Sequence, residues 1–441
     1  MRIWRRGVKL ANFHQQTYIT IPTIPVFLNM KRQPETDLNL SVAKQQKLTD
    51  EQTTETKLTQ EVIEKEEIKP SNVVEKSSDE VKTEEEVKNK EGSENVDGEA
   101  KPQRIKLKKK KFAVYFGYNG EKFVGLQLNP GQYTVELVLE EAMFKAGFIT
   151  KENHKNLKKI GWSRATRTDK GVHAVVNYIA AKLMVEKGKE DVLEDMVSRI
   201  QEHCPSDVSI IGLKPVTTSY NAKNHASSRE YEYILPLKML LPKKVDMETF
   251  DLKAEENKEV REGILKRCAE CCKKFIGTRN YHNYTKKMKA TDPASSRYLK
   301  DFSVSEVFEV NGLEVVKFQL LGQSFLYHQI RKTIGKIIEV CRNEEDVLEI
   351  EKSFMNNAMD IWLAPGDGLL LYKVNFTGYN LKSDIPHKLE LSEEEEARAI
   401  KFKTELHNFI AEKEISNQIF TNWLVRTEEE TAEALRALDE Q

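Results

Sequence analysis

The amino-acid sequence predicts a protein of mixed α and β structure, with strands and helices that alternate along one central region. Residues 112–380 interleave strand patterns with amphipathic helix patterns over about 270 residues. Two β-rich runs in this region are joined by Asn311-Gly312, a dipeptide typical of a tight β-hairpin. These observations favour an α+β or α/β fold with a mixed sheet.

The first part of the central region is expected to contain four strands and two helices. Phe112–Tyr118 is a short apolar run that ends at the turn-forming pair Asn119-Gly120. Apolar residues then recur at helical spacing over residues 134–147. The remaining patterns predict strands at 174–185, 207–218 and 229–236, and a helix at about 190–203.

The second part combines helices with the hairpin. A long helix is expected at about 254–275, and strands at 298–310 and 313–321. Further helices are expected at about 326–342 and 344–356, with a last strand at 369–376. The acidic segment 381–441 is expected to form a helical extension that docks on the core and then frays, because it keeps these apolar residues at helical spacing: Phe402, Leu406, Phe409, Ile410, Ile419, Trp423 and Leu424.

Charge is distributed unevenly along the chain. The sequence has 69 Lys and Arg against 70 Asp and Glu, and the net charge of -1 would by itself argue against a strongly basic nucleic-acid binder. Counted by segment, residues 1–34 carry +6, 35–100 carry -10, 101–380 carry +10 and 381–441 carry -7. The total is a cancellation between unlike segments, so a basic centre remains compatible with RNA binding.

The N-terminal segments are expected to lie outside the folded core. Residues 1–34 are basic and free of acids, which fits either a mitochondrial presequence or a disordered basic arm. Residues 35–111 are expected to form a disordered acidic linker that ends in a basic run, since 35–100 contain no aromatic residue. That run, KPQRIKLKKKK at 101–111, fits a nuclear localisation signal, an RNA-contacting arm or a solvated linker.

The lengths of the apolar stretches and the positions of the cysteines argue against a membrane-spanning protein and against a disulfide-rich protein. The longest apolar stretches fall well short of the ~18–20 residues that a membrane-spanning helix needs. Five unevenly placed cysteines do not form a disulfide framework in a chain of this length, so a reducing compartment is expected. Cys268, Cys271 and Cys272 have no second cysteine pair and lie in a helical pattern, which favours a helix face over a zinc site.

Charged residues concentrate in the stretch GWSRATRTDKGVHAVVNYIAAKL, residues 161–183. Arg164, Arg167, Asp169, Lys170 and His173 lie between apolar patterns, beside a glycine. A charged hairpin turn would explain this chemistry, and so would one carboxylate kept ionised among cations in a cleft. The loop composition alone leaves both interpretations open.

Six blocks of the sequence, in order, resemble the TruA family of tRNA pseudouridine synthases. The resemblance is strongest to the eukaryotic members of that family. RTDKGVHA at 167–174 resembles the defining motif of that family. The other blocks are similar to further family segments: GYNGEKFVGLQLNPGQYTVE at 117–136, REYEY at 229–233, FIGTRNYHNYT at 275–285 with DPASSRY at 292–298, GQSFLYHQIRKTIGKIIEV at 322–340 and APGDGLLL at 364–371. The resemblance covers about residues 112–380.

The resemblance implies the fold and the reaction. It implies a bent mixed sheet of two related α+β halves, at about 112–240 and 241–380, with flanking helices and a central cleft. The implied reaction is the isomerisation of uridine to pseudouridine, which requires neither a cofactor nor a metal. Asp169 matches the essential aspartate of the family and would act either as a nucleophile towards the anomeric carbon or as a base towards the ribose. Arg167 would pair with it or occupy the space that the flipped base leaves.

Further residues match family positions or lie beside them. Tyr231 matches the active-site tyrosine, which would stack on uracil and relay a proton. Arg331 matches an arginine near the catalytic carboxylate, and Leu369 matches a leucine that covers the uracil pocket. Substrate contacts are also expected from the remaining basic residues of these blocks: Arg164, Lys170, His173 and Arg297.

The expected partner is tRNA, with small nuclear RNA or messenger RNA as further substrates. Two segments are locally basic and include aromatic residues, namely 145–170 with Trp162 and 273–300 with Tyr281 and Tyr284. A monomer without membrane association is expected, because the C-terminal extension would cover surface that a second copy could use. The nucleus is the expected location, with the mitochondrion as the alternative that the N-terminus allows.

Two other classes of protein compete with the enzyme. A non-catalytic RNA-binding protein of the same fold is disfavoured by the intact Arg167, Asp169 and Tyr231. A methyltransferase would need a cofactor-binding glycine loop after the first strand, and Gly117-Tyr118-Asn119-Gly120 matches one poorly.

Overall fold

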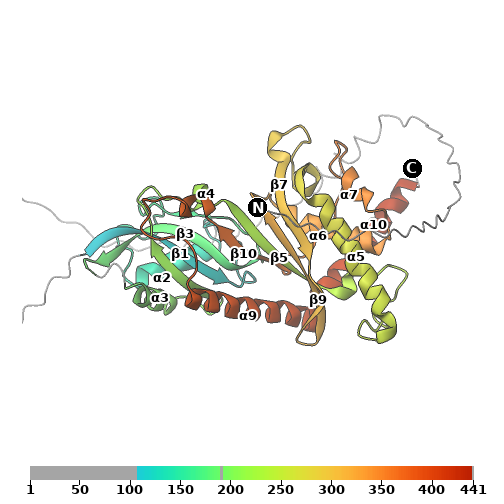
Figure 1. Ribbon diagram of the computed structural model, residues 1–441, viewed down its shortest axis with the longest axis horizontal. Coiled ribbons are helices and arrows are strands. Elements are labelled where there is room, and N and C mark those ends of the chain that lie inside the picture. The colour runs from blue at the N-terminus through green and yellow to red at the C-terminus, as the bar shows by residue number, and fades with distance from the viewer. Residues whose placement is uncertain (1–106, 189–191, 440–441) are drawn as a thin grey trace, which may run out of the picture. The chain divides into compact units, whose positions relative to one another are not determined.

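Within the residues described, ten β-strands form one mixed sheet (Figure 1). The computed structural model describes residues 107–188 and 192–439, which belong to one unit from Gly98 to Gln441. The predictions for 1–34, 35–100 and 101–106 lie outside the described residues. The strands are β1 (Leu107–Tyr118), β2 (Ser163–Arg164), β3 (His173–Glu186), β4 (Val208–Pro215), β5 (Ser228–Pro236), β6 (Gly277–Asn280), β7 (Ser296–Val304), β8 (Phe308–Val310), β9 (Leu313–Gly322) and β10 (Leu369–Asn375).

The strand order confirms the predicted mixed sheet. Along the sheet the strands follow β4-β1-β3-β10-β5-β9-β7-β6, with β2 beside β3 and β8 beside β9. Neighbouring strands are antiparallel except β3 and β10, which run parallel with Leu370 opposite His173. Because β10 of the second predicted half lies between β3 and β5 of the first, the sheet is continuous across the predicted boundary at residue 240.

β1 begins earlier than the sequence pattern indicates. The prediction placed residues 107–111 in a disordered linker, but Leu107 to Lys111 pair with Lys182 to Glu186 of β3. The pairing partner supplies the hydrogen bonds that make these lysines a strand, while their side chains extend towards water. The linker prediction is therefore wrong for the last five residues of the basic run.

The predicted hairpin is present between β8 and β9. Val310 pairs with Leu313, and the two turn residues Asn311 and Gly312 have φ angles of 52° and 85°. Positive φ at both positions is the geometry that makes Asn-Gly favourable in such turns. The predicted strand 298–310 is divided into β7 and β8, because the Ser305 hydroxyl accepts the Lys317 N–H (3.0 Å) in place of a regular ladder bond.

The predicted helices are present with shifted ends. None of the described helices is long and apolar enough to cross a membrane. Cys268, Cys271 and Cys272 are buried on one helix, and the Cys268 sulfur lies 3.7 Å from that of Cys341, so the helix-face interpretation is confirmed. The helices are α2 (Val135–Lys145), α3 (Leu193–Gln201), α4 (Ala222–His225), α5 (Lys258–Phe275), α6 (Gln329–Arg342), α7 (Leu348–Lys352), α8 (Thr377–Asn380), α9 (Glu393–Asn417) and α10 (Ile419–Asp439), with short 3-10 segments at Leu237–Leu240, Glu255–Asn257, His282–Tyr284 and Pro293–Ser295.

The C-terminal extension forms two docked helices where the sequence predicted one. α9 ends at Asn417; the next residue, Gln418, has a left-handed φ of 51°, and the chain then turns into α10. The buried Glu414 carboxylate holds this corner by accepting the Phe420 N–H (2.8 Å) and the Thr421 hydroxyl (2.5 Å). Of the predicted apolar residues, Phe402, Leu406, Ile410, Trp423 and Leu424 are buried, whereas Phe409 and Ile419 are partly buried. Phe420, which the prediction did not include, is also buried.

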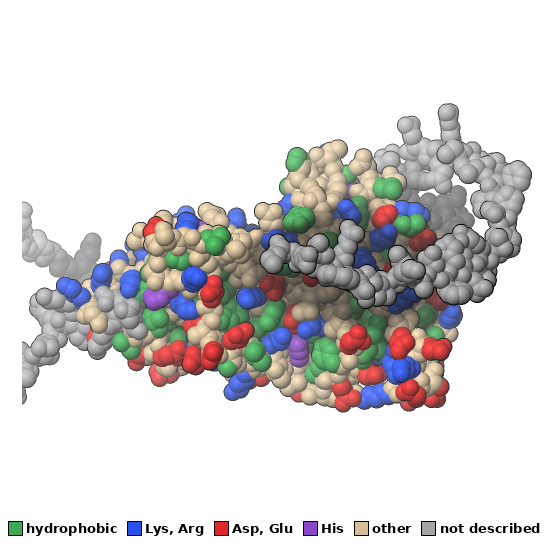
Figure 2. All heavy atoms as spheres, viewed as in Figure 1, with side chains coloured by type: hydrophobic (Ala, Val, Ile, Leu, Met, Phe, Trp, Pro, Cys, Tyr) green, Lys and Arg blue, Asp and Glu red, His purple; other side chains and the backbone are tan. Residues whose placement is uncertain are grey.

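α9 covers one face of the sheet along β3, β4 and β5 (Figure 1). Glu232 of β5 is buried on this face, where it pairs with Lys403 (3.4 Å) and His407 (3.4 Å) of α9. Since neighbouring strand residues point to opposite faces, Tyr231 points away from α9. Figure 2 shows acidic side chains gathered at the edge where α9 begins, with Glu393 to Glu396 in its first turn.

Candidate active site

A cavity of about 440 Å³ lies on the face of the sheet opposite to α9, where the segment between β2 and β3 meets β5 and the residues that lead into α6. Its walls come from segments far apart in the sequence. Among the predicted residues, the structure brings these around the cavity: Arg164, Arg167, Asp169, Tyr231, Arg331 and Leu369. The cavity also includes residues that sequence reasoning did not select: Thr166, Lys223, Arg229 and the run 324–330.

The Asp169 loop is held from β1 and from the segment that follows it. The Thr168 hydroxyl lies 2.7 Å from the Tyr118 hydroxyl, and the Thr168 carbonyl accepts the Leu126 N–H (3.3 Å). Gly171, with a φ of 79°, turns the chain back into β3. These contacts fix the backbone beside Asp169 before any substrate is bound.

The Asp169 carboxylate is mostly removed from solvent, with 25% of its side chain exposed. Burial raises its pKa above the ordinary value, and the Arg331 guanidinium acts in the opposite direction. Arg331 lies on the first turn of α6, where its Nε donates to the Ala364 carbonyl (2.6 Å). The arginine is thereby oriented by the loop before β10, while its charge favours the ionised form of Asp169.

Tyr231 forms another wall of the cavity. Its ring is buried and meets the Phe325 ring edge-on, with centroids 5.1 Å apart. Burial raises the pKa of its hydroxyl, which lies 3.4 Å from the Thr166 hydroxyl, so the phenol stays protonated at neutral pH. Arg229, on the same strand, donates to the Ala165 carbonyl (2.9 Å) and so joins β5 to the Asp169 loop.

His328 is a cavity residue that sequence reasoning missed. The predicted helix at 326–342 begins only at Gln329, because His328 has a left-handed φ of 65°. Its Nε2 lies 3.9 Å from an Asp169 oxygen, and the Tyr327 ring stacks on it at 3.7 Å. Burial, together with the charge of Arg331 and nearby lysines, lowers its pKa to about 4, so the imidazole is neutral at physiological pH. The sequence shows a histidine three residues before Arg331, but it does not show the left-handed backbone.

The exposure and the bonding partners of three predicted residues could not be known from the sequence. Arg167 is exposed where it lines the cavity, and Leu369 is buried in its wall. Arg164 also lines the cavity, but its guanidinium binds the buried Glu136 carboxylate through Nε and through Nη2 (2.8 Å). The Trp162 indole donates to the same carboxylate (2.8 Å), so Arg164 and Trp162 are fixed to the start of α2.

Other predicted substrate contacts lie elsewhere. His173 is buried on the α9 face: its Nδ1 accepts the Gly120 N–H (3.0 Å), and its Nε2 lies 3.0 Å from the Asp367 carbonyl. His173 therefore joins two loops and does not line the cavity. Lys170 is exposed outside the cavity lining, and Arg297 lies on β7 opposite Arg279 of β6, away from Asp169.

Tyr281 and Tyr284, the aromatic residues singled out in the basic segment 273–300, are not accessible to RNA. Both side chains are buried in the core, where they pack against each other and against Phe354. Their hydroxyls bond to the Phe275 carbonyl (3.1 Å) and to Ser353 (2.6 Å). The aromatic side chain of this segment that is exposed is Tyr298.

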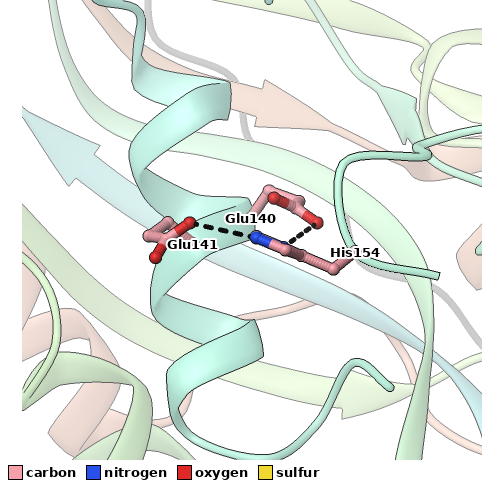
Figure 3. Close-up of side chains that lie close together, drawn as sticks. All are labelled: Glu140, Glu141 and His154. Carbon is pink, nitrogen blue, oxygen red and sulfur yellow. Dashed lines mark hydrogen bonds and ion pairs between the residues drawn. The ribbon is translucent and has the colours of Figure 1, made fainter. Parts of the chain in front are cut away.

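One cluster in the described part of the chain has the donor types of a metal site. Glu140, Glu141 and His154 have ligand atoms within 4.8 Å of one another (Figure 3). The His154 ring lies between the carboxylates, with Nδ1 3.1 Å from Glu140 and Nε2 3.5 Å from Glu141. Each carboxylate faces a different nitrogen of the same ring, so the three side chains contact one another within the cluster.

A largely buried carboxylate beside a cation and an aromatic hydroxyl, in a cavity of this size, is the arrangement of an enzyme active site. Comparison with known proteins identifies the family. A family model described as tRNA pseudouridine synthase matches residues 271–377. The chain is 31% identical to the pseudouridylate synthase 1 homolog of Mus musculus, over 74% of this chain and 76% of the relative.

Two further relatives agree with this result. The pseudouridylate synthase 1 homolog of Homo sapiens is 32% identical, over 70% of this chain and 71% of the relative. The tRNA pseudouridine synthase 1 of Eremothecium gossypii is 31% identical, over 64% of this chain and 66% of the relative. The chain belongs to the tRNA pseudouridine synthase family, as its sequence motifs predict.

Proposed function

We propose that this protein isomerises uridine to pseudouridine in tRNA and that the Asp169 carboxylate carries out the chemistry. The observation that carries the proposal is the position of Asp169: it lies in the one segment that matches the defining family motif and lines a cavity with Tyr231, Arg331 and Leu369. The names of the relatives agree with this activity.

The reaction exchanges one bond of the base for another. The bond from uracil N1 to the ribose C1′ breaks, the base turns within the cavity, and C5 bonds to C1′. The C5 proton leaves and N1 takes up a proton, so the product is an isomer of uridine. Asp169 either attacks C1′ or removes a ribose proton, and either role requires its ionised form. Arg331 supports that form by offsetting the effect of burial on the pKa of Asp169.

Tyr231 and Leu369 act on the base itself. Tyr231 keeps its proton at neutral pH, so it is suited to pass on the C5 proton by giving one proton as it receives another. Leu369 supplies an apolar wall against the uracil ring. The base must leave its stack to reach Asp169, which costs on the order of a few kcal/mol. The exposed Arg167 is placed to fill the space that the base leaves.

The activity is tested by tritium release. Isomerisation replaces the hydrogen at C5, so tRNA labelled with tritium at C5 of uridine gives its label to water when the reaction occurs. We expect release by the full chain without added cofactor or metal. A protein that binds this tRNA but releases no tritium from any tRNA tested would overturn the proposal and favour a non-catalytic RNA-binding role.

The range of substrates and the state of assembly belong to the same proposal. Small nuclear RNA and messenger RNA are proposed as further substrates. This proposal is tested by mapping pseudouridine across cellular RNA in cells with and without the protein. A monomer is proposed because α9 packs along β3, β4 and β5 and so covers surface that a second copy could use. Sedimentation equilibrium of the full chain should give a mass of about 50.9 kDa, and a mass of twice that value would contradict it.

Nuclear location is proposed from the basic run at 101–111, with the mitochondrion as the alternative. A fluorescent fusion of the full chain is expected in the nucleus and should lose that location when 101–106 are deleted. Accumulation in mitochondria would instead indicate that residues 1–34 act as a mitochondrial targeting sequence.

A further inference from the structure

A second cavity, of about 560 Å³, lies beside α2, where Leu137 and Glu140 line it. Its floor is apolar and is formed by Leu128, Leu137 and Leu157. The Glu136 carboxylate joins it to the active-site cavity: Glu136 accepts from Arg164 (2.8 Å), which lines the first cavity, and from the Leu128 N–H (2.9 Å), which lines the second. The two cavities are therefore near enough to take neighbouring parts of one RNA strand.

An aromatic ring borders the second cavity and is held rigidly. Tyr133 has 46% of its surface exposed, and its ring stacks on the buried Phe123 ring with centroids 5.1 Å apart and an interplanar angle of 16°. Phe123 packs edge-on against Tyr118, whose hydroxyl bonds to Thr168, the residue before Asp169. Such a fixed aromatic face is a platform on which an unpaired base can stack.

Amide groups next to Tyr133 can contact the edge of a base. Asn129 and Gln132 both line the cavity, and their side-chain amides are bonded to each other at 3.2 Å. In that bond the Asn129 amide donates and the Gln132 carbonyl oxygen accepts. The Asn129 oxygen and the Gln132 NH₂ group can therefore accept from and donate to a base. The apolar floor, the aromatic face and the amide pair together match a planar ring with polar edges.

The rim of the second cavity is positively charged. Lys155 lines it, and Lys151, Lys158 and Lys159 are exposed in the same segment, where Glu152 is the one exposed acid. Glu140 also lines the cavity, but its side chain is only 3% exposed, and its Oε1 accepts the Lys155 N–H (2.8 Å) and faces His154. The accessible charge therefore favours phosphates over an acidic or apolar partner.

We propose that this second cavity binds one unpaired nucleobase of the substrate RNA, a nucleotide close to the target uridine, with Tyr133 as the stacking platform. The proposal rests on the function proposed above and specifies part of its substrate recognition. It assigns Tyr133 a role in RNA affinity and in the choice of target.

The test couples a change in the protein to a change in the RNA. A panel of tRNA transcripts, each with one abasic nucleotide near the target uridine, is titrated against the full chain. Stacking of one base contributes about 1–3 kcal/mol, so one abasic position should weaken wild-type binding by about 5- to 150-fold. Tyr133→Ala should bind intact tRNA more weakly by a similar factor and lose nothing further with that abasic transcript, whereas Tyr133→Phe should bind as the wild type.

A matched control and a second readout distinguish the possible failures. Tyr298→Ala removes a tyrosine of similar exposure, 45%, on β7, and should keep the full abasic penalty. Tritium release by Tyr133→Ala at saturating tRNA reports whether the active site is intact, independently of affinity. Wild-type affinity in Tyr133→Ala, or an abasic penalty that persists in it, would overturn the second-cavity proposal and leave the proposed function standing.

Discussion

Gly125 gives a prediction in which the structure separates catalysis from folding. Its φ is 78°, and a Cβ atom added to it would lie 2.8 Å from the Thr168 carbonyl oxygen and 3.5 Å from the Asp169 carbonyl carbon. Gly125→Ala therefore introduces two costs: a left-handed alanine and a contact with the backbone that positions Asp169. Gly312→Ala introduces the first cost alone, because Gly312 has a φ of 85° with nothing within 4 Å of its added Cβ.

The sizes of the two costs follow from the geometry. A left-handed non-glycine residue costs roughly 1–2 kcal/mol, so both variants should lose about this much stability, and Gly125→Ala should lose more because its Cβ also crowds the Thr168 carbonyl. Only Gly125→Ala must also displace Thr168, by about 0.6 Å to bring the 2.8 Å contact to an ordinary 3.4 Å. A misplacement of about 1 Å can cost about 100-fold in rate, so a shift of this size should lower the rate on the order of tenfold.

Both variants are measured in the same two assays. Apparent thermal unfolding midpoints should fall in both variants, and further in Gly125→Ala. The kcat for tritium release should fall about tenfold in Gly125→Ala while remaining near wild type in Gly312→Ala. Equal rates in the two variants at 25 °C would refute the reasoning, since the close approach of Gly125 to the Asp169 loop would then be irrelevant to catalysis.

Three further predictions concern charge and backbone conformation. Arg331 acts to lower the pKa of Asp169, so Arg331→Met should raise that pKa and move the acidic limb of kcat against pH to higher pH; a limb that stays or moves down contradicts this. Burial lowers the pKa of His173 to about 4 from an ordinary 6.5, so the unfolded chain binds a proton that the folded chain does not, and stability falls as pH decreases between these values. The loss from pH 7 to pH 5 should be about 2 kcal/mol, and thermal unfolding of His173→Gln should show a flatter pH dependence. His328→Gly should unfold at a higher temperature than His328→Ala by the equivalent of roughly 1 kcal/mol, because the position is left-handed, and the reverse order would count against that geometry.

The elements of the fold could be predicted where the signal is local. The Asn311-Gly312 turn and the apolar faces of α9 and α10 depend on nearby residues, and the structure confirms them. The start of β1 could not be found in this way, because Lys108 to Lys111 are a strand only through pairing with β3, about 75 residues further along the chain. The local charge predicts a linker, but pairing with the distant β3 makes these residues a strand.

Several of the predicted site residues lie around one cavity, and the sequence does not indicate the residues at its edges. Asp169, Tyr231 and Arg331 surround one cavity as their motifs indicate. His173 belongs to the same motif, yet β3 begins at this residue and turns its side chain to the α9 face, so the motif could not tell a loop-joining residue from a substrate contact. His328 was missed because its left-handed backbone depends on where α6 begins.

The central claim is that the Asp169 carboxylate isomerises uridine, and single-turnover tritium release with excess enzyme tests it most directly. Asp169→Asn removes the negative charge with little change of shape, so it should bind tRNA with near wild-type affinity and release no tritium. Asp207→Asn, which alters a carboxylate that pairs with Lys122 at 2.8 Å, should release tritium as the wild type does. Tritium release by Asp169→Asn at the wild-type rate would contradict the account.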